Sequence, residues 1–219
     1  GVDAESQANP TVNAYIKGGT IRTSGAVLVE ALSETNAETD SYGIAVGGLA
    51  IGVSLSDATT SPTLNAKIGC DVVATPVCST TAIHTTSGSI TARALNNMSS
   101  TGTVVNNADS KPNGAYAYAN PSGGGVLSGN GADVNSTASA TIDTQVGTST
   151  TLNSGGAIHL ASYTSSLADA KGYGVVIGGL TVGAILTNAT ADGNIQARLE
   201  GNVTSGTSLT VETYAINTA

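Results

Sequence analysis

The feature that most constrains the fold of this chain is an internal repeat. Shifting the 219-residue sequence by 131 positions aligns Gly25–Ile68 with Gly156–Leu199 without a gap, and 13 of the 44 aligned residues are identical. The identical residues include Gly47-Gly48-Leu49 and their counterparts Gly178-Gly179-Leu180. A gapless match of this length predicts that the chain is built from copies of one structural unit.

A weaker copy lies between these two. It begins at Ser87–Ile90, carries Gly124-Gly125-Val126 in place of Gly-Gly-Leu, and has an insertion around Asn106–Ala119. We therefore predict one repeat domain over residues 1–219, built from three units of roughly 65 residues. The predicted units are 19–81, 82–149 and 150–216, with a disulfide-stapled insertion at 69–86.

Each unit contains a clear strand pattern. Val27–Ser41 alternates with a period of two, so that Val27, Val29 and every second residue after them share one face. Ile158–Ala170 alternates in the same way in the last unit. Period-two alternation predicts β-strands, and the small residues on the shared face predict a thin, closely packed interior.

The paired glycines reverse this pattern. Ile44 and Val46 have one parity, whereas Leu49 and Ile51 have the other, and Gly178-Gly179 separates the same two patterns in the last unit. A two-glycine break that reverses the apolar face indicates a kink where a strand turns a corner, which makes Gly47, Gly48, Gly178 and Gly179 the predicted kink glycines. Kinked ribbons that recur in register predict an all-β, repeat-built β-solenoid or layered β-arch stack with Gly-Gly kinks. The alternative is a long-stranded β-sandwich.

The two ends of the sequence look like incomplete units. Val12–Ile16 resembles Leu64–Ile68, and Ser208–Tyr214 resembles Ala26–Leu32. Neither end resembles the polar cap that a repeat protein needs to stay monomeric, and uncapped strand edges can pair with another chain. We therefore expect edge-to-edge self-association into a filament, sheath or surface layer. A processed fragment of a longer repeat protein, whose neighbouring units are covalent, is the alternative.

The cysteines predict an oxidising environment. Cys70 and Cys78 are the two cysteines of the chain, and neither histidine lies at zinc-ligand spacing from them. A disulfide between Cys70 and Cys78 is the preferred interpretation over two free thiols, and it indicates an extracellular protein.

Charge and hydropathy exclude two classes of partner. The chain carries 7 Lys and Arg against 15 Asp and Glu, a net charge of -8, whereas a nucleic-acid surface needs clustered cations. The longest apolar run, Gly43–Leu55, is 13 residues long. A membrane-spanning helix needs about 20 residues, so we expect no nucleic-acid binding and no membrane span.

The acidic residues suggest two kinds of site, and neither has a convincing pattern. Glycoside hydrolysis needs two carboxylates at a defined separation, and no spacing favours Asp57 with Asp71 or Asp133 with Asp143. One strand face carries carboxylates that could bind Ca²⁺, although a solvated face that resists aggregation explains them better, because the last unit does not repeat them. These carboxylates are Glu30, Glu34, Glu38 and Asp40. His84 and His159 are isolated, so we predict no enzymatic activity, no cofactor and no metal.

Four Asn-x-Ser/Thr sequons allow N-glycosylation without indicating it, because this composition produces about that number by chance. They are Asn97, Asn135, Asn188 and Asn202.

Together, these motifs resemble the repeats of giant secreted exoproteins of prokaryotes. The residues that carry the resemblance are Thr23–Gly25, Val27–Ala31, Gly47–Gly52 and Ala66–Gly69. Such filamentous-adhesin-like proteins form β-solenoid stalks on cell surfaces. The resemblance implies an extracellular or cell-surface structural protein whose main partner is itself. The alternative function is a stalk or receptor-binding segment of an adhesin, in which a loop such as Lys111–Pro121 contacts cell-surface glycans or neighbouring cells.

Overall fold

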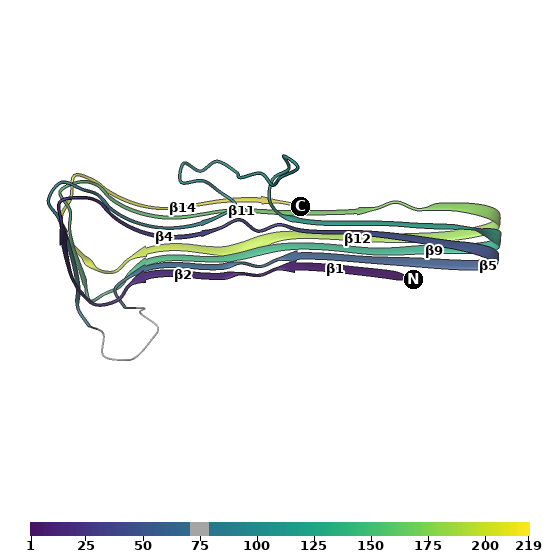
Figure 1. The fold of residues 1–219 in the computed structure, drawn as a ribbon, viewed down its shortest axis with the longest axis horizontal. Helices are drawn as coiled ribbons and strands as arrows, with labels where there is room; N and C mark the ends of the chain where they lie inside the picture. Colours follow the sequence, from purple (N-terminus) through teal and green to yellow (C-terminus); the bar gives the residue numbers. More distant parts are fainter. Residues whose placement is uncertain (71–78) are drawn as a thin grey trace.

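The computed structural model describes residues 1–70 and 79–219, which form an elongated body of long strands (Figure 1). The described part of the chain contains no helix. Its strands are β1 (Val2–Ala8), β2 (Thr11–Ile16), β3 (Gly19–Thr23), β4 (Val27–Ser33), β5 (Ala37–Thr60), β6 (Thr63–Ile68), β7 (Thr81–Thr85), β8 (Ile90–Asn96), β9 (Ala115–Val146), β10 (Thr150–Asn153), β11 (Ile158–Gly172), β12 (Val175–Leu199), β13 (Asn202–Ser205) and β14 (Leu209–Thr218).

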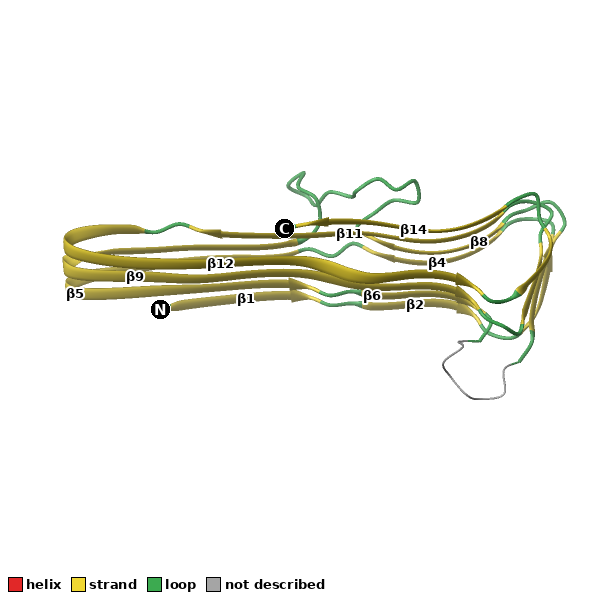
Figure 2. Cartoon of the chain, turned by 180° about the vertical axis from the view of Figure 1, so that it is seen from behind, coloured by secondary structure: helices red, strands yellow, loops and turns green. Residues whose placement is uncertain are grey.

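All of these strands pair in parallel. The larger sheet has ten strands in the order β1-β5-β9-β11-β8-β4, with β2, β6, β12 and β14 attached to it, and it curls like half of a barrel. As a result its two sides run along each other, as Figure 2 shows. The second sheet has four strands in the order β13-β10-β7-β3 and lies where the chain turns between β2 and β4 (Figure 1).

This architecture corrects the fold class expected from the sequence. The chain forms neither a β-solenoid or layered β-arch stack nor a long-stranded β-sandwich. The prediction treated the repeat units as layers that lie on top of one another. In the structure, the strands of successive units instead pair side by side within the same parallel sheets, with equivalent residues opposite each other. A sandwich would need antiparallel pairs, and every strand pair of the described residues is parallel. Wholly parallel sheets are typical of α/β proteins, although no helix covers this one in the described residues.

The strand registers match the sequence repeat. Four equivalent residues lie side by side on β2, β6, β9 and β12, namely Val12, Leu64, Ile142 and Ile195. We call each run of the chain along the sheet a pass, and these residues belong to the first, second, third and last pass in that order. A second row joins β4, β8, β11 and β14. Its members are Val27, Ile90, Ile158 and Leu209. The similarity of Val12–Ile16 to Leu64–Ile68 is confirmed as a strand pairing, whereas Ser208–Tyr214 and Ala26–Leu32 lie on the two outermost strands of the second row and do not pair with each other.

The long strands β5, β9 and β12 reverse direction at one end of the body, the right-hand end of Figure 1. We call this end the distal arch, and it consists of residues 44–53, 122–131 and 175–184. The two arms of β5 face each other closely, because Thr39 Oγ1 lies 2.7 Å from Ser56 Oγ. A Cβ on Gly43 would lie 2.7 Å from Ser54 Oγ, so the interior between the arms accepts only small residues.

The predicted kink glycines lie in this arch. Between β5 and β9 the register runs from Gly47 opposite Gly125 to Leu49 opposite Leu127, and it omits Gly48. The middle unit therefore aligns one residue later than Gly124-Gly125-Val126 suggested. Its Gly-Gly-Gly-Val-Leu segment fits both alignments at the level of sequence, and strand pairing selects the one that matches leucine with leucine.

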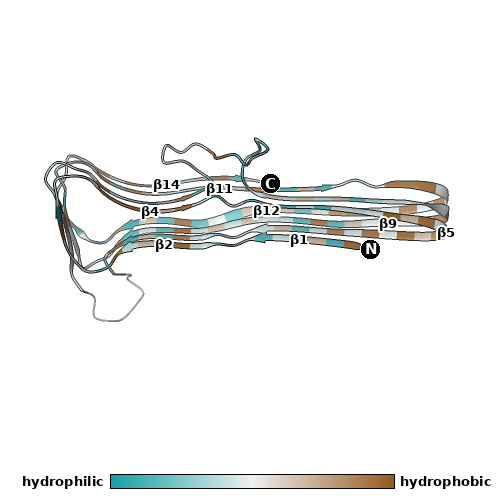
Figure 3. Cartoon of the chain, in the orientation of Figure 1, coloured by the Kyte–Doolittle hydropathy of each residue, from teal (hydrophilic) through white to brown (hydrophobic). Residues whose placement is uncertain are grey.

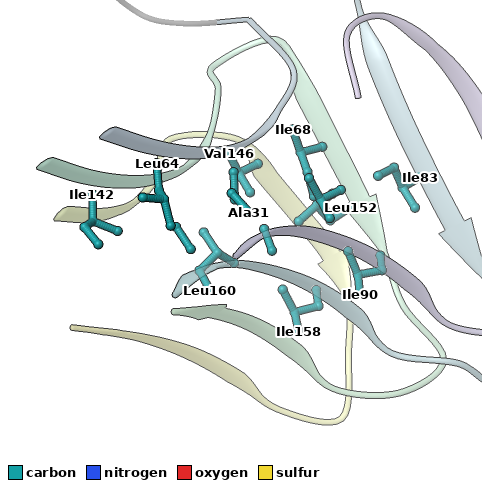
Figure 4. Close-up of a cluster of buried hydrophobic side chains, with 14 of the residues drawn as sticks. Ala31, Leu64, Ile68, Ile83, Ile90, Ile142, Val146, Leu152, Ile158 and Leu160 are labelled. Carbon is teal, nitrogen blue, oxygen red and sulfur yellow. The ribbon is translucent and has the colours of Figure 1, made fainter. Parts of the chain in front are cut away.

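The core divides into two parts with different side chains. Large aliphatic residues fill the end away from the arch, where Leu64, Ile142, Leu152, Ile158 and Leu160 pack together (Figure 4). Toward the arch, alanines take their place. The alternation predicted for Val27–Ser41 is confirmed, because the odd-numbered residues from Val29 to Ser41 are buried.

Candidate functional site

Two open strand edges are the first candidate site. The first pass ends the sheets with β1, β2, β3 and β4, and the last pass ends them with β12, β13 and β14. Among the described residues, neither edge has a strand on its outer side. An edge of this kind presents a row of N–H and C=O groups that can pair with another chain.

The two edges have complementary hydrogen-bond phases, which means that the residues with outward-pointing backbone N–H and C=O groups on one edge match those on the other. The Thr63 N–H donates to Pro10 O at 2.9 Å, so alternate residues of β2 direct their backbone N–H and C=O groups toward β6. The backbone groups of Thr11, Asn13 and Tyr15 therefore point outward. On the opposite edge the Glu200 N–H donates to Val146 O at 2.9 Å, so the backbone N–H and C=O groups of Ile195, Ala197 and Leu199 point outward. Because backbone groups alternate along a parallel ladder, each edge continues the pattern of the other.

Charged groups are fixed on the last edge strand. Glu212 of β14 accepts hydrogen bonds from the Tyr163 hydroxyl and from His159 Nε2, which lies 2.8 Å from its Oε1. These two bonds lower the pKa of Glu212, the bond from Tyr163 most of all. Burial and the same hydrogen bond raise the pKa of Tyr163 to about 12. The cluster ties β14 to β11 on the outer surface of the sheet.

A groove beside an inserted loop is the second candidate site. The inserted loop, residues 97–114, connects β8 with β9 and stands away from the sheet (Figure 1). It begins earlier than the insertion predicted around Asn106–Ala119. Between this loop and the outer face of β5, β9 and β11 lies a groove of about 650 Å³.

The loop is held firmly at its base. Asn97, at a φ of 53°, is buried and accepts a hydrogen bond from the Thr35 N–H at 2.7 Å. Its amide also donates to Thr35 O and Ser165 O. Met98 packs with Leu95, and the Tyr116 hydroxyl donates to Pro112 O at 2.5 Å. The groove wall is therefore part of the folded structure.

Tyrosine rings form the floor of the groove and continue beyond it. Tyr116 and Tyr118 lie two residues apart on β9 and share its outer face. The Tyr118 ring lies 5.8 Å from the Tyr42 ring and 5.5 Å from the Tyr173 ring, measured between centroids. Burial, together with the nearby carboxylates of Asp169 and Glu38, raises the pKa of Tyr116, so its hydroxyl stays protonated.

The charges around the tyrosines are mostly paired. Lys111 Nζ lies 3.5 Å from Glu38 Oε1 and 5.4 Å from the centre of the Tyr116 ring. Lys171 bonds to Asp169, and this bond raises the pKa of Lys171. Asp40 adds a third carboxylate to the lining. The groove thus combines aromatic faces with both hydrogen-bond donors and acceptors at nearly balanced charge.

The surface of the distal arch is apolar. Ile44 and Val46 are each 82% exposed, and Ile177 and Val182 are about as open at 72% and 69%. None of the arch residues is charged, and Figure 3 shows the resulting hydrophobic end of the body. Because the interior between the arms accepts only small residues, the large aliphatic side chains have to point outward.

The carboxylates predicted from the sequence lie in several different places. Glu30 forms an ion pair with Arg93, Glu38 pairs with Lys111, and Glu34 is exposed. The row of four carboxylates is therefore partly neutralised by cations of β8 and the inserted loop. Among the described residues, no three His, Cys, Asp or Glu side chains are grouped so that they could hold a metal ion.

The carboxylate pairs considered for catalysis do not come together. Asp133 and Asp143 lie ten residues apart on β9, which is about 33 Å along a strand. That separation far exceeds the roughly 5–10 Å used in glycoside hydrolysis. Asp143 instead pairs with Lys67 at 3.3 Å and Arg198 at 2.9 Å. Asp71, the proposed partner of Asp57, lies outside the described residues.

The remaining predicted residues are also widely separated. Cys78 lies outside the described residues, so the Cys70–Cys78 disulfide stays a prediction. His84 lies on β7 between Arg22 and Asn153, and it belongs to no metal-binding group of three His, Cys, Asp or Glu side chains in the described structure.

The four sequons differ in exposure. Asn97 is buried and its amide is engaged, which leaves it inaccessible to a glycan in the folded chain. Asn135 is half-buried, whereas Asn188 and Asn202 are exposed on the last pass. The exposed pair is accessible, and its sequons still allow glycosylation without indicating it.

We did not predict the groove from the sequence, although the insertion and a pair of tyrosines beside it both pointed to it. Tyr116 and Tyr118 form a Tyr-x-Tyr pair immediately after the insertion that interrupts the repeat. The lysines and carboxylates that complete the lining come from β5, β11 and the loop, and only the strand registers bring them together.

Comparisons with known proteins identify no relative. No family model matches the chain, and no curated protein or solved structure is significantly similar to it. The resemblance to filamentous-adhesin-like exoproteins therefore stays a hypothesis that rests on the repeat motifs. The described part of the chain also contains no helix with the length and apolar character needed to cross a membrane.

Proposed function

We propose that this protein is an extracellular structural protein that self-assembles through its open strand edges into a filament, sheath or surface layer. The observation that carries the proposal is the complementary hydrogen-bond phase of the first and last passes. Head-to-tail addition would place Val12 of one copy beside Ile195 of the next, and Val27 beside Leu209. These contacts would extend the two rows of core residues across the junction.

The two edges differ from each other, which determines the kind of assembly. A contact between unlike surfaces is heterologous, so it grows into an open polymer unless a rotation closes it into a ring. The edges terminate the same parallel ladders on opposite sides, and successive copies would therefore add in one direction. The predicted disulfide supports an extracellular location for such a polymer.

The apolar distal arch supports contacts between copies as well. Exposed apolar patches on ordinary monomers rarely exceed about 300–600 Å², and larger ones mark interaction sites. The arch exposes large aliphatic residues on all three of its strands, including Ile44, Val126 and Ile177. Further copies packed against these uncharged surfaces would bind polymers side by side, as a sheath or layer requires.

Assembly can be tested by blocking one edge without disturbing the fold. The Val27 N–H donates to Ser89 O at 2.9 Å, so the next residue, Leu28, directs its N–H outward from β4. Leu28 is about half exposed. Leu28→Pro removes the outward donor and places a ring at the junction, whereas the matched control Leu28→Ala keeps the donor.

Light scattering and electron microscopy over a concentration series give the readout. We expect concentration-dependent polymers for the unmodified chain and for Leu28→Ala. For Leu28→Pro we expect the concentration needed for assembly to rise at least about tenfold, which corresponds to roughly 1.4 kcal/mol per junction. Circular dichroism checks that both variants fold. An unmodified chain that stays monomeric at every concentration would contradict the proposal.

A further inference from the structure

We propose that the groove beside the inserted loop binds an uncharged oligosaccharide. The groove also reaches the last edge strand, because Thr218 of β14 belongs to its lining, but the inference does not depend on self-assembly. The groove is lined by Tyr116 and Tyr118 on β9 and by Lys111 and Pro112 on the loop. A site that combines aromatic faces with a few convergent polar groups is a typical ligand-binding arrangement.

The aromatic floor suits the flat, apolar faces of sugar rings. Tyrosine offers a broad ring face for stacking and a hydroxyl for hydrogen bonding. Tyr42, Tyr118 and Tyr173 form a continuous row across three passes of the chain. This row extends the floor past the groove, so a chain of several sugar units could follow it across the strands.

The charge balance selects an uncharged ligand. Three carboxylates, Glu38, Asp40 and Asp169, face two ammonium groups in the lining, and most of these charges are already paired. A phosphate or sulfate ligand would need a surplus of cations, which the groove lacks. A cationic ligand would have to displace Lys111 from the face of Tyr116. Sugar hydroxyls can donate to the carboxylates and accept from the lysines, so an uncharged sugar needs neither a surplus of cations nor the displacement of Lys111.

The position of the groove within the repeat is the second argument. The loop interrupts the repeat between β8 and β9, and it is fixed by the buried Asn97 and by the Tyr116–Pro112 hydrogen bond. A loop that departs from a regular scaffold and is held rigidly is where binding residues are commonly found. Because the wall is already ordered, little conformational entropy would be lost on binding.

Binding can be measured with defined probes. The chain contains no Trp, so its seven tyrosines dominate the intrinsic fluorescence. We would titrate uncharged hexasaccharides (cellohexaose, maltohexaose, laminarihexaose and chitohexaose) and follow tyrosine fluorescence and calorimetry. Hexagalacturonate and the chitosan hexamer serve as anionic and cationic counterparts. We expect at least one uncharged probe to bind with a Kd of about 1 mM or tighter, and both charged probes to bind more weakly.

Variants assign the binding to the groove. Tyr118→Ala should weaken it by about tenfold, whereas Tyr118→Phe keeps the stacking face and should retain most of the affinity. Tyr15→Ala is the matched control, because Tyr15 is an exposed tyrosine on β2 outside the groove lining. The proposal fails if no uncharged probe binds, if a charged probe binds more tightly, or if Tyr118→Ala and Tyr15→Ala behave alike.

Discussion

The row formed by Val12, Leu64, Ile142 and Ile195 allows the packing of successive passes to be measured. Ile142 is 1% exposed and lies between Leu64 and Ile195, so each side of it is covered by a neighbouring pass. Ile142→Ala removes three carbon atoms, which at roughly 0.8 kcal/mol each gives about 2.4 kcal/mol of lost transfer energy. The cavity left in a closely packed interior raises the expected loss of stability to about 3–4 kcal/mol.

The same substitution at the last pass should cost less. Ile195 is only partly buried and has Ile142 on one side, whereas no strand covers its other side in the described structure. Ile195→Ala should therefore lower the free energy of unfolding by about 1–2 kcal/mol in the monomer. Guanidinium unfolding followed by circular dichroism, at concentrations below assembly, gives both values. Equal losses for the two variants would refute the idea that each pass is buried by its neighbours.

Two further predictions concern the arch and the last edge. Gly178→Ala should destabilise the chain by about 1–3 kcal/mol in thermal unfolding, because the new Cβ would lie 2.1 Å from Gly125 O. Gly47→Ala should be nearly neutral, because the atom nearest to its new Cβ would be 3.5 Å away. The pKa of Glu212 is lowered in the folded chain, so its bonds stabilise β14 above the ordinary carboxyl pKa and are lost as the pH falls through the lowered value. The protection factor of the β14 amides, which is the ratio of their intrinsic to their measured exchange rate, should therefore fall in acid, and Glu212→Gln should abolish that fall; an unchanged pH profile in Glu212→Gln would count against this reasoning.

The strand pattern could be predicted in detail because local side-chain alternation produces it. The buried face of Val27–Ser41 follows from residues at every second position, and the pairing of β2 with β6 follows from the similarity of Val12–Ile16 to Leu64–Ile68. Each of these inferences compares side chains along one strand or between two aligned segments. The strands and their buried faces were therefore accessible without coordinates.

The way in which the units combine was not accessible in the same way. Periodicity shows that a strand has two faces, but it does not show whether its repeat partner pairs at its edge or packs on its face. Backbone hydrogen bonds decide this, and they depend little on side-chain identity. The alignment of the middle unit failed for a related reason, because three successive glycines at Gly123–Gly125 give no side-chain signal for a one-residue shift.

The inserted loop shows how a repeat of paired strands can also carry a separate site. The register runs from Ser33 opposite Asn96 to Ala37 opposite Ala115, so the ladder resumes directly after the loop leaves and returns. The two strands that the loop connects, β8 and the start of β9, each have a neighbouring strand on both sides, so they are held even where the chain departs from them. An insertion in the first or last pass would interrupt an edge that the proposed assembly needs. An inner pass is therefore the place where a binding loop leaves both edges intact.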